Sequence, residues 1–189
     1  MMKFKTLETI EKYACDIDLL KSNLRKTDDS QDNYLYSLIK TATKKAENYI
    51  GKQIVRSKIL GFCPYVGKIQ YEINRGANIV IEKVELVLID GTTLTLDSAY
   101  YESFVEELDA YLFIKSPDKL ANVSRTHPAA IQITFSAGWD GTELMPFPED
   151  IVNAIAMKAT RMYMNPDDGV DEKTTASENL LKPYRCPIL

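Results

Sequence analysis

The spacing of apolar positions predicts one long helix near the start of the chain. Between residues 34 and 50, apolar side chains recur at steps of three and four, which places them on one helix face. These residues are Tyr34, Leu35, Leu38, Ile39, Ala42, Ala46, Tyr49 and Ile50. The opposite side carries Lys40, Lys44, Lys45 and Glu47. Asp32 is placed to cap the first free N–H groups, and Gly51 is placed to end the helix. We expect this helix to serve as a scaffold.

Two other segments have helical spacing. Apolar residues between Thr6 and Leu20 share one face, which predicts a first helix there. Asp150–Met164 is apolar over a wide arc, and Pro148 precedes it in a position that suits the first turn of a helix. We therefore expect this second helix to be buried on more than one side.

The middle of the chain alternates with period two, which is typical of strands. The segments with this pattern are Gln53–Pro64, Lys68–Ile73, Ile79–Ile89, Thr92–Leu96, Tyr100–Phe104, Tyr111–Ile114 and Ala129–Phe135. Asp90-Gly91 has the composition of a two-residue hairpin turn, and Gly61 is a candidate bulge. The strands are expected to pair mostly antiparallel.

Together these elements predict an α+β fold. N-terminal helices and one buried C-terminal helix form a small helical bundle, with an inserted, mostly antiparallel β region and a flexible C-terminal tail. The predicted parts are residues 1–52 (helical), 53–145 (β-rich), 146–166 (the buried helix) and 167–189 (a polar linker and a docking tail). No apolar run reaches the length of about 18 residues that a membrane span needs, and no secretory leader is evident, so we expect synthesis in the cytoplasm.

Charge is unevenly distributed along the chain. The net charge is −4, but residues 1–81 carry a balance of +5 and residues 82–150 a balance of −9. An acidic middle argues against that part gripping nucleic acid phosphates. Opposite charges on one chain also suit head-to-tail contact between copies, so Lys40, Lys44 and Lys45 of one copy are candidate ring contacts for Glu106 and Glu107 of the next.

Residues that could carry catalysis are scarce. The single histidine, His127, precedes a proline, and Cys15, Cys63 and Cys186 are too far apart for a zinc knuckle, which favours buried thiols. Carboxylates gather only at Glu102, Glu106, Glu107 and Asp109, without a phosphate-binding loop. We therefore expect no enzyme activity, no metal and no cofactor.

The order of three regions resembles the head–tail connector (adaptor) family of tailed bacteriophages. The first region consists of Leu24-Arg25, Asp28-Asp29, Asp32, Leu35, Leu38-Ile39, Ala42, Glu47, Asn48-Tyr49 and Gly51. The second consists of Ile81, Val84, Val87, Asp90-Gly91 and Tyr100 or Tyr101. The third consists of Ile131, Ile133, Thr134, Phe135, Ala137, Gly138, Trp139, Pro146 and Pro148. A Leu-Leu-x-x-Tyr-Arg ending extends the resemblance to Arg185.

This resemblance implies a structural role in the virion neck. Family members form a ring, typically of twelve copies, that docks on the portal protein, contacts other neck and tail-completion proteins, and lets genome DNA pass without sequence-specific binding. The residues expected to dock on the portal are Leu180, Leu181, Tyr184 and Arg185. Deleting Asn179–Leu189 is expected to abolish portal binding and leave a folded protein. The alternative is a nucleic-acid-binding module that uses the face formed by Lys40, Lys44 and Lys45.

Overall fold

The structure is a computed structural model in which residues 2–165 and 175–185 are described. The chain divides into two compact units. The sheet unit comprises Met1–Ile10 and Arg56–Gly138, and the helical unit comprises Glu11–Val55 and Trp139–Leu189. Most of the predicted polar linker lies outside the described residues, and so do the last four residues, of which Cys186 is the first.

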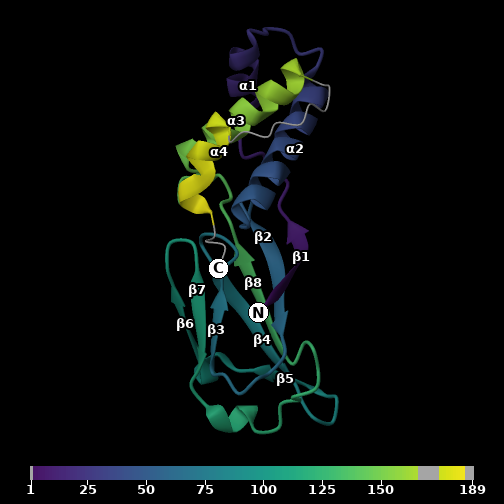
Figure 1. Cartoon of the computed structure of the whole chain (residues 1–189), viewed down its shortest axis with the longest axis vertical. Helices are drawn as coiled ribbons and strands as arrows, with labels where there is room; N and C mark the ends of the chain where they lie inside the picture. Colours follow the sequence, from purple (N-terminus) through teal and green to yellow (C-terminus); the bar gives the residue numbers. More distant parts are fainter. Residues whose placement is uncertain (1, 166–174, 186–189) are drawn as a thin grey trace. The chain divides into compact units, whose positions relative to one another are not determined.

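The sheet unit contains two antiparallel sheets (Figure 1). Its strands are β1 (Lys3–Thr9), β2 (Ser57–Cys63), β3 (Gln70–Ile73), β4 (Val80–Val87), β5 (Thr93–Leu96), β6 (Tyr101–Val105), β7 (Ala110–Ile114) and β8 (Ile131–Ala137). A five-stranded sheet has the order β1-β2-β8-β4-β5, and a three-stranded sheet has the order β3-β7-β6. The short 3-10 helices are η1 (Ser98–Tyr100) and η2 (Pro117–Leu120).

One apolar core lies between these two sheets. Along β8, buried and half-buried side chains alternate strictly, as the period-two pattern predicts. The five-stranded sheet contributes Ile59, Val84, Leu86, Leu96, Ile131, Ile133 and Phe135, and the three-stranded sheet contributes Tyr71, Ile73, Ala110, Leu112 and Ile114. Burying each large side chain of this kind stabilises the unit by about 1.5–3 kcal/mol. Each sheet therefore has one covered face and one outer face.

Strand β1 corrects the predicted helix over Thr6–Leu20. Strand β1 pairs with β2, from Lys3 opposite Phe62 to Thr9 opposite Ser57. The ring of Phe4 packs edge-on against Phe135 at 6.1 Å between centroids. These non-local contacts outweigh a helical spacing that had little else to support it. The range 1–52 is therefore not helical throughout.

The glycines of the sheet unit act in different ways. A hairpin turns at Asp90-Gly91, but its loop has three residues, 89–91, where the sequence predicted two: Gly91 has a φ of 83°, and the N–H of Leu88 donates to the carbonyl of Thr92 at 2.8 Å. The bulge predicted at Gly61 is wrong, because Gly61 pairs in register with its neighbours on both sides. A Cβ atom there would lie 3.3 Å from the ring of Phe4, so Gly61 provides room for close packing.

The helical unit is built from four helices in the described part of the chain. They are α1 (Ile17–Leu24), α2 (Asp32–Ile50), α3 (Glu149–Met164) and α4 (Ala176–Leu181), and the 3-10 turn η3 (Lys182–Tyr184) follows α4. Helix α3 packs against the other three helices, and Figure 1 shows it beside α2. The buried side chains include Leu20, Leu35, Ile39, Ala42, Ala46, Ile50, Ile151, Ala154, Ile155, Ala159 and Leu181. The predicted α+β class, with an inserted antiparallel β region, is confirmed.

The two ends of α2 differ in how far they follow prediction. Gly51 ends the helix as predicted, with a φ of 74° and an N–H that donates to the carbonyl of Glu47 at 2.9 Å. The predicted cap at Asp32 is wrong, because Gln31 occupies the cap position, and its side chain makes no capping hydrogen bond. The carboxylate of Asp32 instead forms an ion pair with Lys21 of α1, whose Nζ lies 2.6 Å from the Asp32 Oδ1.

Candidate assembly surfaces

The C-terminal segment, residues 175–185, packs on its own helical unit. Helix α4 begins with a capping box, in which the Thr175 Oγ1 accepts from the Glu178 N–H at 3.3 Å and the Glu178 Oε2 accepts from the Thr175 N–H at 3.1 Å. Lys158 of α3 lies 3.6 Å from Glu178. Leu181 is fully buried, so it anchors this segment in the core.

The residues after α4 contact aromatic side chains of the same unit. The ring of Tyr184 meets Trp139 edge-on at 6.3 Å, and the Arg185 guanidinium lies 5.2 Å from the centre of the Tyr49 ring. Arg185 is exposed, whereas Tyr184 and Leu180 are half-buried. Of the predicted portal-docking residues, the structure thus leaves surface on three and covers Leu181.

This packing revises the predicted behaviour of a truncated chain. Deleting Asn179–Leu189 removes Leu181 from the core, and removing a buried leucine side chain costs about 2–5 kcal/mol. Truncation would therefore weaken the helical unit as well as remove a docking segment. Single substitutions of exposed residues separate the two effects.

The predicted ring-contact residues are all on the surface. Lys40, Lys44 and Lys45 lie on the exposed side of α2, and the Lys44 Nζ is 3.0 Å from the Glu47 Oε2. Glu106 and Glu107 are exposed in the turn between β6 and β7. The lysines belong to the helical unit and the glutamates to the sheet unit.

Glu47 is a buried residue that the sequence pattern placed on the polar side of α2, and this placement is wrong. Its side chain is 7% exposed. The Oε1 atom accepts from the Gln53 Nε2 at 2.7 Å and from the backbone N–H of Ile54 at 3.0 Å and Val55 at 3.4 Å. A carboxylate near the negative end of a helix is disfavoured by the helix dipole, so the position of Glu47 is a signal of a special role. Glu47 fixes the path of the chain as it leaves α2.

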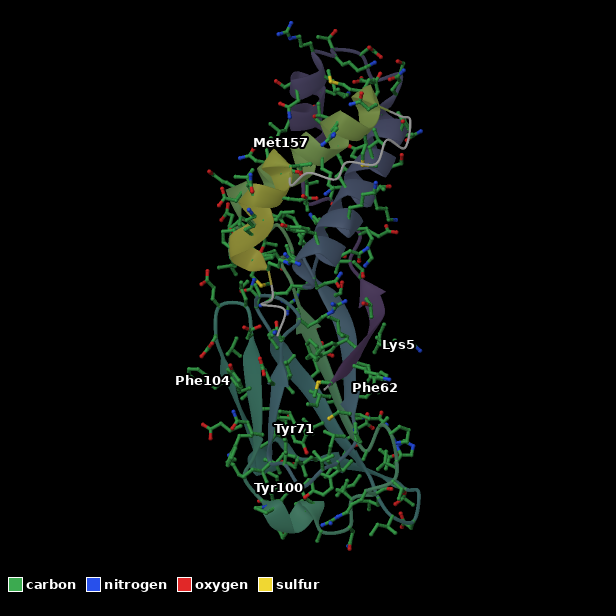
Figure 2. The ribbon with its side chains drawn as sticks, viewed as in Figure 1. Lys5, Phe62, Tyr71, Tyr100, Phe104 and Met157 are labelled. Carbon is green, nitrogen blue, oxygen red and sulfur yellow. The ribbon has the colours of Figure 1, made fainter. Side chains whose placement is uncertain are left out.

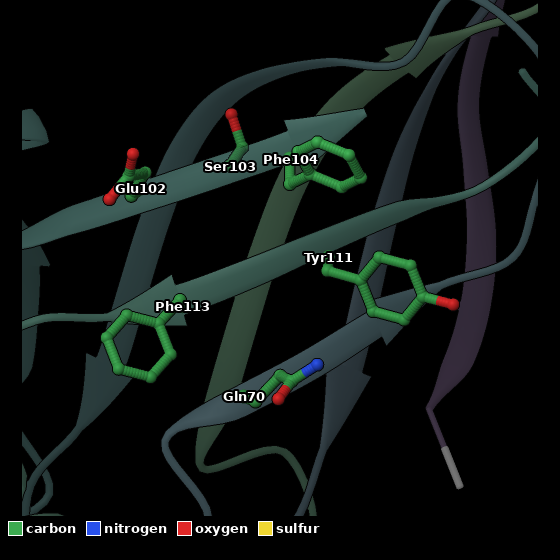
Figure 3. A pocket seen from close by; sticks show the side chains of 6 residues that line it. All are labelled: Gln70, Glu102, Ser103, Phe104, Tyr111 and Phe113. Atoms are coloured by element: carbon green, nitrogen blue, oxygen red, sulfur yellow. The ribbon is translucent and has the colours of Figure 1, made fainter. Parts of the chain in front are cut away.

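The outer face of the three-stranded sheet is aromatic and acidic, which the alternation pattern did not identify as a surface. A shallow hollow of about 350 Å³ lies on it. Figure 3 shows the lining side chains on three neighbouring strands: Gln70 on β3, Tyr111 and Phe113 on β7, and Glu102, Ser103 and Phe104 on β6. The negative charge of Glu106, and then that of Glu72, raises the pKa of the Tyr111 hydroxyl.

His127 and the described cysteines, which were considered for catalysis, have hydrogen bonds or burial that serve the local structure. His127 Nδ1 accepts from the Ala129 N–H at 3.2 Å within its loop. Cys15 and Cys63 are buried free thiols, as predicted. No group of three or more His, Cys, Asp or Glu residues in the described ranges is arranged to hold a metal ion. Among the same residues, no helix is long and apolar enough to cross a membrane.

The fold is similar to solved structures of particle necks. A chain in the neck of an empty GTA particle, computed with C6 symmetry, has a TM-score of 0.76 with this chain at 14% identity, covering 99% of this chain and 97% of that one. A chain in the virion of the native gene transfer agent (GTA) particle has a TM-score of 0.71 at 14% identity, with coverage of 98% and 96%. A third, in the neck of the native GTA particle computed with C12 symmetry, has a TM-score of 0.70 at 14% identity, with coverage of 99% and 97%.

Sequence comparison gives a family match for part of the chain. No curated protein sequence matches the chain. The family model of phage gp6-like head-tail connector proteins matches residues 15–87, a stretch that runs from α1 to the end of β4. Residues 15–87 therefore carry the sequence pattern of the phage gp6-like head-tail connector family, and the resemblance identified from the sequence is confirmed.

Proposed function

We propose that this chain is a structural virion protein, a head–tail connector that joins capsid to tail in the neck of a phage or phage-like particle. The observation that carries the proposal is the connector-family match over residues 15–87 on a chain whose fold follows particle-neck chains over nearly its full length. The matching family and neighbours are neck proteins, and no catalytic step enters the proposal.

The connector acts as a homo-oligomeric ring, and the number of copies that we propose is twelve. Chains of the same fold come from necks computed with C6 and C12 symmetry, which supports a ring of this order. The ring docks on the portal, meets further neck and tail-completion proteins, and leaves a bore through which genome DNA passes. A net charge of −4 favours passage of DNA over adhesion to its phosphates. Many individually weak contacts become strong when the ring closes on a multivalent portal.

Portal engagement is assigned to the exposed side of the C-terminal segment. Arg185 and Tyr184 are residue types that anchor interfaces, and both have surface left after packing on Tyr49 and Trp139. Leu180 adds half-exposed apolar surface, and Leu181 holds the segment in place from within the core.

Ring contacts between neighbouring copies include the exposed charges of α2 and of the β6–β7 turn. Lys40 and Lys45 are exposed on one unit, and Glu106 and Glu107 are exposed on the other. Such pairs fix the register of a contact more than they add affinity. The nucleic-acid alternative uses the same lysines.

Complementation of defective particles tests the proposed function. Particles made without this chain are expected to yield separate heads and tails, and adding the purified protein is expected to restore joined particles in electron micrographs. The Arg185→Ala variant should restore fewer joined particles than a control with Lys12→Ala, because Lys12 is exposed and lies outside the C-terminal segment. Particles that join equally well without the protein would overturn the proposal.

A further inference from the structure

The outer face of the three-stranded sheet presents aromatic rings between carboxylates. The strand register sets two rows across it: Gln70, Phe113 and Glu102 form one, and Glu72, Tyr111 and Phe104 form the other. Phe104 is 65% exposed and Phe113 is 41% exposed. We call these six residues the acidic face.

This face has features of an unfilled interface. Large aromatic side chains with this much exposure are unusual on a free surface when they cluster, and they are the residue types that anchor contacts between proteins. No lysine or arginine in the described part of the chain forms an ion pair with Glu72 or Glu102. The face therefore offers apolar area together with negative charge that its own chain leaves uncompensated.

The opposite outer face, on β1 and β2, carries the complementary chemistry. Lys3 pairs in register with Phe62, and Lys5 with Leu60. Both lysines are exposed, and neither forms an ion pair among the described residues, while Leu60 and Phe62 are half-buried. We call these four residues the basic face. Figure 2 shows Lys5 and Phe62 on one side of the sheet unit and Phe104 on the other.

We infer that the acidic face of one copy docks on the basic face of the next copy. The inference rests on the proposed ring and names a contact within it. The two faces belong to the two sheets that enclose one core, so they point away from each other. A contact between opposite sides of one unit repeats head to tail, and it closes into a ring when the rotation between copies permits.

The negative charge and the apolar area of the acidic face together favour a second copy of this chain as its partner. Lys3 and Lys5 match the uncompensated Glu72 and Glu102, while the rings of the acidic face meet Phe62 and Leu60. A nucleic acid would be repelled by the carboxylates of the acidic face. Like charges brought together at such a contact cost several kcal/mol, which makes charge reversal a sharp probe.

The test uses two charge-reversed variants of the full chain. One carries Glu72→Lys and Glu102→Lys, and the other carries Lys3→Glu and Lys5→Glu. Each is mixed with purified portal protein from the same genome, and the number of bound copies is measured by light scattering. For each variant alone, the number of copies bound on the portal should fall about ten-fold or more, because the contact between copies has become repulsive. Mixed together, the two variants should assemble again, because each reversed face then meets an opposite charge.

Two controls separate this contact from general damage. Lys12→Glu with Arg125→Glu makes the same charge change as the Lys3→Glu, Lys5→Glu variant, at exposed positions outside both faces, and should assemble like wild type. Phe104→Ala should weaken assembly, whereas Val66→Ala, at a side chain that is 67% exposed, should not. Wild-type assembly of both reversed variants, or failure of their mixture, would overturn the inference while leaving the proposed function intact. If wild-type protein itself forms no ring on the portal, the proposed function fails and takes this inference with it.

Discussion

Two buried charges, Glu47 near the end of α2 and Lys21 on α1, decide local structure in the helical unit. The helical spacing predicts Glu47 on the polar side of α2, yet its carboxylate is buried and accepts hydrogen bonds from residues 53–55. These partners lie beyond the end of the helix, and they come close to Glu47 only because the chain turns at Gly51. Lys21 is held between two carboxylates, with its Nζ 2.6 Å from the Oδ1 of Asp29 and 2.6 Å from the Oδ1 of Asp32.

Replacing Glu47 by alanine should destabilise the helical unit by about 2–4 kcal/mol, because several buried donors lose their acceptor. Chemical denaturation followed by circular dichroism measures the change. Asn48→Ala is the matched control on the same helix; Asn48 is exposed, and its loss should cost no more than about 0.5 kcal/mol. Equal effects of the two substitutions would show that Glu47 does not hold the segment after α2.

The Lys21 ion pairs should make stability depend on alkaline pH. Hydrogen bonds to Asp29, and then to Asp32, raise the pKa of Lys21 above its ordinary value of 10.5. A raised pKa means that this stabilisation is complete below about pH 10.5 and is lost as pH rises through the folded-state pKa. The difference in unfolding free energy between wild type and Lys21→Met should stay constant from pH 7 to about pH 10 and shrink above it. A difference that grows with pH would contradict the assignment.

At the scale of elements, those that depend on local sequence signals were predicted well, whereas the strand that depends on non-local pairing was not. Helix α2 with its Gly51 stop, the hairpin at Asp90-Gly91, and α3 after Pro148 follow from residues within one or two turns. Strand β1 depends on β2, more than forty residues away, so its own sequence did not reveal it. Helix α4 did carry a signal, since Thr175 and Glu178 have the spacing of a capping box.

Docking of α4 should depend on Leu181 far more than on its neighbour. Leu181→Ala empties a fully buried site and should cost about 2–5 kcal/mol, whereas Leu180→Ala removes a half-buried side chain and should cost less. Thermal unfolding measures both variants. Hydrogen exchange of the α4 amides shows whether the loss is local, with faster exchange expected in the Leu181 variant. Matching behaviour of the two variants would contradict the assigned anchor.

At the scale of the whole molecule, the order of the elements was more informative than any motif. The family match covers residues 15–87, and the likeness in fold to a particle-neck chain covers 99% of this chain. The sequence predicts a helical part with an inserted β-rich region, but it does not show that residues 1–10 join residues 56–138, because that depends on the β1–β2 pairing. The outer faces of the sheets were hidden for a similar reason: alternation shows that a strand has two sides, and only the sheet order shows which side is left uncovered.

The central claim is that copies of this chain assemble into a ring on the portal. Multi-angle light scattering of the protein alone, and then mixed with the portal protein from the same genome, tests it most directly. A shift to one large complex with a fixed number of copies per portal is the predicted result, and it also gives that number. Protein that ignores the portal at every ratio, but is retained on DNA at low salt, would contradict the claim and favour the nucleic-acid-binding role of Lys40, Lys44 and Lys45.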